Sequence, residues 1–301
     1  MREFPPLSRN KSQKVVLIPK NRASLPSPER KSYRLAVISF GVSFDLSANH
    51  GDLLQEARSF LPLGSKQSGS AHPDLSYSLQ GPTPSGVDSR YRLRRNGRQL
   101  FTTDHRQELL ERFHSVVSLD VADRSSSRTF IHAGVVGWGN FAILIPGRSL
   151  TGKSTLVAAL IRAGASYYSD EFAVIDRQGR VHPYPRPLQM REEGSHHQTS
   201  HPVEEFGGKA AIRPLAVRLV LVTRHKPGAS WLPRQLSPGI GMLKLLDNTV
   251  SARRSPAQAL HTLKQVVAKA QIVRSSRGEA SQIVDWLTAN FGPPHGRRSG
   301  S

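Results

Sequence analysis

The stretch from Phe141 to Thr155, FAILIPGRSLTGKST, constrains the fold of this chain more than any other feature. It begins with five apolar residues, continues through a turn bounded by Gly147 and Gly152, and ends in Lys153, a serine and a threonine. This is the pattern G-x-x-x-x-G-K-[ST] without a gap, and an apolar helical run follows it. The succession of strand, glycine turn and helix predicts an α/β fold, with a β-sheet core around this turn and helices packed against it.

The spacing of the pattern has a direct physical reason. Two glycines let the backbone curl so that successive N–H groups point inward at phosphate groups, and the following helix adds its positive N-terminal end. Lys153 is spaced to reach the β- and γ-phosphates of a nucleotide, and the Ser154 hydroxyl to bind Mg²⁺. The predicted nucleotide-binding residues form one run: Gly147, Arg148, Ser149, Leu150, Thr151, Gly152, Lys153, Ser154 and Thr155.

A pair of acids, Asp170 and Glu171, follows the loop and is flanked by apolar segments on both sides. We expect it at the end of a strand in a parallel sheet, within reach of the metal and the γ-phosphate. One carboxylate would then hold Mg²⁺ and the other would accept a proton from an attacking hydroxyl. Which acid has which role stays open at this point. The alternative is an exposed acidic pair in a turn.

The segments FIHAGVV, IPGRSLTGKST and YYSDEFAVID together resemble the C-terminal, catalytic domain of HPr kinase/phosphorylase. That family of bacterial serine kinases has a fold related to ATP-type phosphoenolpyruvate carboxykinase. The resemblance covers about residues 130 to 174, and Pro187-Leu-Gln-Met-Arg191 is similar to a further segment of the family. Without the resemblance, His132 in its apolar strand would be interpreted as a core residue.

The resemblance implies a P-loop kinase core that binds ATP and Mg²⁺ and phosphorylates a protein or peptide serine. The residues that it places in catalysis are His132, Lys153, Asp170, Glu171 and Arg191. The residues that it places at the metal are Ser154, Asp170 and Glu171. Members of the family are oligomers, which implies a homo-oligomer here, although the sequence itself leaves the oligomeric state and the acceptor open.

Three positions depart from the family pattern. Glu171 stands where the family has a second Asp, Gln189 where it has a metal-side Glu, and Arg148 where it has an acid. Whether the reverse, phosphorylase reaction occurs therefore stays open. The first 120 residues do not resemble the family's N-terminal domain and are more similar to a group of HPr-kinase-like proteins with a different β-rich leader.

Changes in composition along the chain predict four parts. Residues 1–31 are expected to be a disordered basic tail, 32–120 an α+β leader region, 121–292 the P-loop kinase-like domain, and 293–301 a disordered tail. In the leader, Asn96-Gly97 between two short β-type segments predicts a hairpin. Asp104 and Gln107 have the spacing of a capping box, which predicts a helix from Asp104. Residues 183–214 are expected to be irregular.

Composition limits the location and partners of the chain. The absence of cysteine excludes disulfides and thiol chemistry and suits a reducing cytoplasm. No apolar run is long enough for a membrane span and the N-terminus lacks the apolar core of a signal peptide, so we expect a cytoplasmic protein without a membrane partner. The net charge of +20 suggests nucleic acid, but no aromatic-interleaved basic motif accompanies it, and nucleic acid is not the expected partner.

Three functional hypotheses remain after these observations. The leading one is an ATP-dependent serine kinase resembling HPr kinase. The second is an ATP-binding module without catalytic activity, and the third is a basic, nucleic-acid-linked ATPase.

A group of three histidines does not predict a metal site, because it is isolated from other ligand types. We expect a solvated loop at these residues, His196, His197 and His201.

Overall fold

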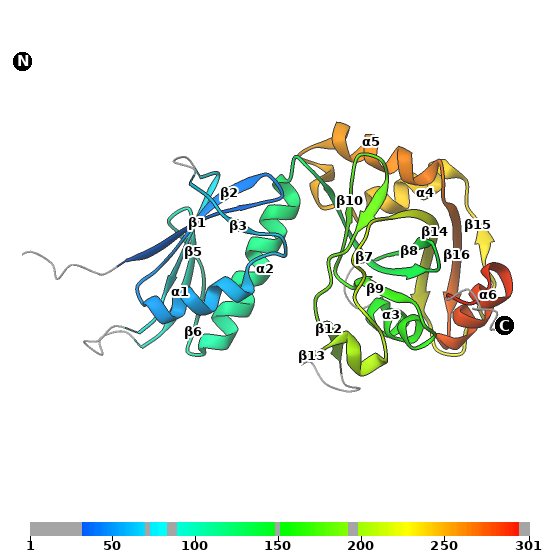
Figure 1. Ribbon diagram of the computed structural model, residues 1–301, viewed down its shortest axis with the longest axis horizontal. Helices are drawn as coiled ribbons and strands as arrows, with labels where there is room; N and C mark the ends of the chain where they lie inside the picture. The colour runs from blue at the N-terminus through cyan, green and yellow to red at the C-terminus, as the bar shows by residue number, and fades with distance from the viewer. Residues whose placement is uncertain (1–31, 70–72, 83–88, 148–150, 192–197, 295–301) are drawn as a thin grey trace, which may run out of the picture.

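The computed structural model describes residues 32–69, 73–82, 89–147, 151–191 and 198–294. The predicted tail 1–31, most of the predicted tail 293–301, and Arg148, Ser149 and Leu150 lie outside the described residues. The fold is mixed α/β, as the sequence predicts, with two large sheets in two lobes (Figure 1). Among the described helices, none is long and apolar enough to cross a membrane.

The first lobe is a six-stranded sheet in the order β3-β1-β2-β4-β5-β6. Its strands are β1 (Tyr33–Ser39), β2 (Val42–Ala48), β3 (Lys66–Gln67), β4 (Leu75–Gln80), β5 (Tyr91–Arg95) and β6 (Arg98–Thr103). Its helices are α1 (Gly51–Ala57), the short η1 (Arg58–Phe60) and α2 (Arg106–Arg124). Alternate strand residues such as Phe44, Leu46 and Tyr77 are buried against Leu53 of α1 and Phe113 of α2, so one face of the sheet carries the lobe's core.

Local patterns in this lobe gave one correct and one wrong prediction. The hairpin is confirmed, because β5 and β6 pair antiparallel around Asn96 (φ 50°) and Gly97 (φ 77°). The capping box is wrong: α2 begins at Arg106, its N-cap is His105, and no side chain caps it. Thr103 takes the place of Asp104, since its hydroxyl accepts from the His105 N–H at 3.1 Å and donates to Glu108.

The second lobe contains an eight-stranded sheet whose main path is β11-β10-β7-β8-β14-β16-β15, with β9 also paired to β7. Its strands are β7 (Thr129–Trp138), β8 (Phe141–Pro146), β9 (Ser166–Ser169), β10 (Phe172–Ile175), β11 (Arg180–His182), β14 (Leu215–His225), β15 (Arg234–Gln235) and β16 (Gln271–Arg277). Strands β14 and β16 run parallel to β8, and β7 runs antiparallel to it. Because β9 and β10 are antiparallel to β7, they run in the same direction as β8.

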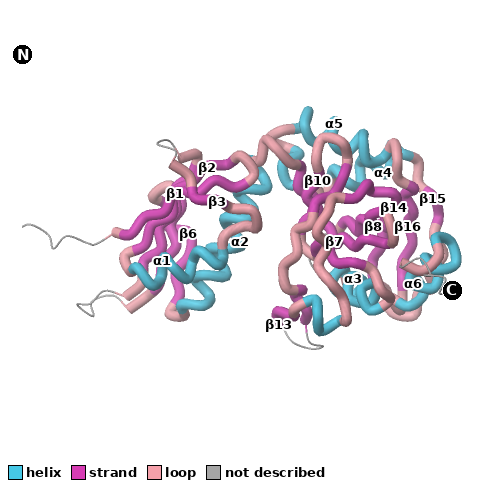
Figure 2. The backbone as a smooth tube through the Cα atoms, viewed as in Figure 1, coloured by secondary structure: helices cyan, strands magenta, loops and turns pink. Residues whose placement is uncertain are grey.

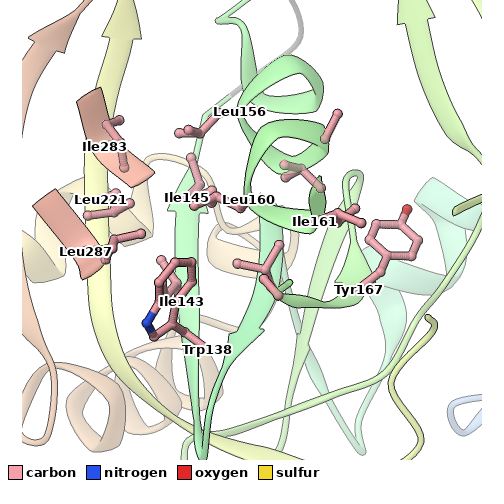
Figure 3. Packing of buried hydrophobic residues seen from close by; sticks show 14 of the residues in the cluster. Trp138, Ile143, Ile145, Leu156, Leu160, Ile161, Tyr167, Leu221, Ile283 and Leu287 are labelled. Carbon is pink, nitrogen blue, oxygen red and sulfur yellow. The ribbon is translucent and has the colours of Figure 1, made fainter. Parts of the chain in front are cut away.

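Helices cover both faces of this sheet (Figures 1 and 2). They are α3 (Lys153–Arg162), α4 (Pro238–Leu246), α5 (Pro256–Val267) and α6 (Ser281–Phe291), with the short η3 (Val250–Ala252). The side chains of β8 alternate: Ile143 and Ile145 pack with α3 and α6, as Figure 3 shows, and Leu144 packs with α4 and α5. The two apolar clusters hold β8, and therefore the turn that follows it, at the centre of the lobe.

Aromatic and polar contacts join the two lobes. Phe40 of the first lobe packs edge-on against Phe130 of β7, with ring centroids 5.1 Å apart. Arg254 forms an ion pair with Asp123 at 2.5 Å. The boundary predicted at residue 120 falls inside α2, which connects the lobes.

Residues 183–214 contain more structure than the sequence predicts. A small hairpin, β12 (Leu188–Arg191) with β13 (Gln198–His201), is followed by the 3₁₀ turn η2 (Val203–Phe206). Leu188, Val203 and Phe206 are buried against α3 and its neighbours. The expectation of an irregular section is therefore wrong, because a few apolar residues fix an otherwise polar segment on the core.

Candidate functional site

The site forms at the carboxyl ends of three parallel strands of the second sheet, β8, β14 and β16. The turn after β8, residues 147–152, is called the phosphate loop here, and it ends at Gly152, the N-cap of α3. Its two described ends are tied to the sheet, because the Gly147 N–H donates to the His132 carbonyl of β7 at 3.0 Å and the His225 N–H of β14 donates to the Thr151 carbonyl at 3.4 Å. The sequence-predicted order of strand, turn and helix is confirmed at these ends.

Glycine is required at two positions around the loop. Gly152 has φ 80°, a left-handed conformation that favours glycine, and an added Cβ there would lie 2.6 Å from the Arg277 guanidinium. Gly134 of β7 lets α3 approach closely, since a Cβ there would lie 2.6 Å from Val157. The start of α3 is thus held directly against β7, beside the strands that carry the acids.

Asp170 and Glu171 lie in the bend between β9 and β10. The Ser154 hydroxyl donates to Asp170 Oδ2 at 3.2 Å, and the Gln189 backbone N–H donates to the same oxygen at 3.1 Å. The Tyr167 hydroxyl donates to Asp170 Oδ1 at 3.1 Å. Asp170 is only 7% exposed, so the alternative of an exposed acidic turn is wrong for this residue. Asp170 thus reaches Ser154 in the first turn of α3, directly after the loop, although β9 pairs with β7 and not with β8.

Burial shifts the pKa values of Asp170, Glu171 and Lys153. It raises the pKa of Asp170, and the hydrogen bonds from Gln189, Tyr167 and Ser154 oppose that change. It raises the pKa of Glu171 to about 7, with Arg186 lowering it and Asp170 raising it further. It lowers the pKa of Lys153, which both carboxylates counteract. A lysine and two acids are therefore held together in a poorly hydrated place.

His132 lies on β7 opposite Phe172, the residue that directly follows Glu171 in the chain. It pairs with Phe172 across β7 and β10, and the two rings are tilted at 37° with centroids 4.8 Å apart. The next residue of β7, Ala133, donates its N–H to the Glu171 carbonyl at 3.2 Å. His132 thus connects, through its backbone and its neighbour, the start of the phosphate loop to the acidic bend.

The remaining predicted positions are placed as follows. Thr155 is in the first turn of α3 and is exposed, unlike Ser154, which contacts Asp170. Arg191 is the last residue of β12, and its side chain lies outside the described structure. Gln189 contributes its backbone N–H to Asp170, whereas its side-chain amide donates to Ser200 at 3.1 Å.

Three further residues belong to the site, although the sequence patterns assigned none of them a role there. The single hydroxyl proton of Tyr167 is shared between Asp170 and the Arg186 carbonyl, which is the nearer acceptor at 2.7 Å. The Arg186 guanidinium donates to His114 of α2 at 2.8 Å, which connects the site to the first lobe. Arg277, at the end of β16, donates to the Gly152 carbonyl at 2.6 Å. Tyr167 lies three residues before Asp170, in β9, whereas Arg186 and Arg277 come from segments that are distant from the phosphate loop in the sequence.

The arrangement offers oxygen ligands of the kind that Mg²⁺ prefers: the Ser154 hydroxyl and the Asp170 carboxylate, with Glu171 next in the chain. Within the described ranges, no group of three or more His, Cys, Asp or Glu side chains could hold a metal without other ligands. His201 pairs with Glu205 at 2.7 Å, and His196 and His197 lie outside the described residues. A nucleotide's phosphate oxygens would complete a metal shell at Ser154 and Asp170.

No protein-family model matches this chain, and no curated protein sequence matches it.

Proposed function

We propose that this chain is an ATP-dependent serine kinase of the HPr kinase kind, which transfers the γ-phosphoryl group of ATP to a protein or peptide hydroxyl. The hydrogen bond between Ser154 and Asp170 carries the proposal. It joins the hydroxyl that ends the phosphate-binding pattern to a buried acid from a separate strand. Phosphoryl-transfer enzymes of the P-loop class use this pair of groups to hold Mg²⁺.

Each group of the site has a role under this proposal. The N–H groups of the phosphate loop and the Lys153 ammonium bind the β- and γ-phosphates. Ser154 and Asp170 would hold Mg²⁺, which supplies neutralisation of phosphate charge when it is bound. Tyr167 keeps the Asp170 carboxylate oriented through Oδ1, so that Oδ2 stays directed at Ser154.

Glu171 is the general base in this scheme. Its pKa of about 7 leaves it able to accept a proton near neutral pH. The acceptor's O–H bond breaks and its proton moves to Glu171, while the oxygen forms a bond to the γ-phosphorus. The bond from that phosphorus to the bridging oxygen of ADP breaks, and ADP leaves with the electron pair.

The test is transfer of label from γ-labelled ATP to an acceptor in a lysate of the host cell. We expect Lys153→Ala to abolish labelling, because it removes the cation at the transferring group. Asp170→Asn should retain part of the ATP binding while turnover falls, and Glu171→Gln should lower turnover by about a hundredfold or more. Lys264→Ala, an exposed lysine of α5, is the matched control and should label like the wild type. Undiminished labelling by Lys153→Ala would refute the proposal.

The same experiment separates a second candidate, an ATP-binding module without transfer. Gln189 favours this candidate, because its backbone N–H donates to Asp170 while its side-chain amide is bonded to Ser200. Position 189 therefore supplies no side-chain oxygen next to Asp170 for a metal ion. Tight ATP binding without any labelled acceptor would support the module and exclude the kinase.

A further inference from the structure

The side of the phosphate loop opposite the acids is formed by a buried arginine. Arg277 is the last residue of β16 and pairs with His225 at the end of β14. The Lys226 N–H donates to the Arg277 carbonyl at 2.8 Å, which fixes this edge of the sheet. The Arg277 side chain is 2% exposed, although arginine is among the residue types least often buried.

The guanidinium of Arg277 contacts backbone carbonyls. It donates to Gly152 O at 2.6 Å and to Gly278 O at 3.3 Å, and Nε has no hydrogen-bond partner among the described residues. No ion pair of Arg277 occurs within the described ranges, and Glu279, the acid that acts on its pKa, is exposed. The undescribed part of the loop, Arg148-Ser149-Leu150, contains no carboxylate. Among the described residues, this buried cation therefore has no anionic partner.

The contact with Gly152 determines how the loop ends. The Gly152 carbonyl also accepts the first helical hydrogen bond of α3, from the Leu156 N–H at 3.2 Å. In a trans peptide the carbonyl and the following N–H point in opposite directions. By holding the Gly152 carbonyl, Arg277 therefore fixes the direction of the Lys153 N–H, one of the donors at the positive end of the helix.

We propose that Arg277 is a positioning residue of the phosphate loop, which holds the Gly152–Lys153 peptide for a polyphosphate and whose buried charge the bound polyphosphate offsets. The inference rests on the proposed function, because it names a determinant of binding at the same site. It also explains why position 152 is glycine, since a Cβ there would collide with this guanidinium.

The test measures equilibrium binding of ATP and of inorganic triphosphate in EDTA, by calorimetry, together with thermal unfolding of the ligand-free protein. Arg277→Met removes the charge and both donors while keeping an unbranched side chain. We expect its affinity for both ligands to fall by about ten- to a hundredfold, whereas its unfolding temperature without ligand stays at or above that of the wild type. Arg277→Lys should recover part of the affinity. Arg274→Ala, an exposed arginine of the same strand, is the matched control and should bind like the wild type.

The outcomes distinguish this inference from the proposed function. If the wild type binds triphosphate and Arg277→Met binds it equally well, the inference is wrong and the proposed function is unaffected. If Arg277→Met loses affinity only in proportion to a lowered unfolding temperature, and Arg277→Lys recovers none, Arg277 is structural and the inference is also wrong. A wild type that binds neither ATP nor triphosphate overturns both.

Discussion

Replacing Glu171 by Gln should stabilise the protein increasingly as the pH rises from 4.5 to about 7, and by a constant amount above that. Gln keeps the size of the side chain and removes its ionisation. In the folded protein burial raises the pKa of Glu171 to about 7, whereas the ordinary value of 4.5 applies to the unfolded chain. The folded state thus binds more protons than the unfolded state between these two values.

The sign and size of the effect follow from this difference. An acid whose pKa is raised by folding makes the protein lose stability as pH rises from 4.5 to about 7, after which the loss is constant. At 1.36 kcal/mol for each pKa unit, the full loss is about 3 kcal/mol. Asp170 is also shifted upward and is coupled to Glu171, so the comparison measures Glu171 together with its coupling to Asp170 and Lys153.

Urea unfolding followed by tryptophan fluorescence at pH 4, 6 and 8 measures the free energy of unfolding for this comparison. We expect Glu171→Gln and the wild type to agree at pH 4, and the variant to be more stable by about 3 kcal/mol at pH 8. Glu204→Gln, which changes an exposed acid of η2, should show no such pH dependence. A difference between Glu171→Gln and the wild type that is the same at all three pH values would refute the reasoning.

Two further substitutions test the packing around the site. Leu160→Ala removes a fully buried side chain between α3 and the sheet, and we expect urea unfolding to show a loss of about 2–5 kcal/mol; a loss below 1 kcal/mol would contradict this packing (Figure 3). Tyr167→Phe removes the hydroxyl that donates to Asp170 and to the Arg186 carbonyl, and we expect a loss of about 1–3 kcal/mol by the same method, whereas unchanged stability would show that these bonds contribute nothing.

Local sequence patterns predicted the features that depend on local physics. The Asn96-Gly97 hairpin and the glycine-bounded turn before Lys153 depend on backbone conformations that few residue types adopt. A short sequence motif is therefore enough to predict them. The capping prediction at Asp104 failed for a related reason. Thr103, just before it, accepts from the His105 N–H and donates to Glu108, and the helix begins two residues later than the pattern predicted.

The parts of the site that were not predicted depend on strand order. Tyr167 lies only three residues before Asp170. Its hydroxyl is nevertheless fixed by the Arg186 carbonyl, which comes from a later segment of the chain. Arg277 is far from Gly152 in the chain and meets it because β16 lies parallel to β14, which lies parallel to β8. No spacing rule relates these positions, since the loops between the strands vary freely in length.

The charges around the loop are arranged so that a single ligand could offset all of them. On one side, burial disfavours the ionised forms of Asp170 and Glu171, which a cation would stabilise. On the other side, the buried Arg277 guanidinium has only carbonyl partners among the described residues, and an anion would stabilise it. A protein selected only for stability would replace such groups by apolar ones. The metal complex of a nucleoside triphosphate carries a cation and an anion next to each other, and this is the ligand that the proposed function requires.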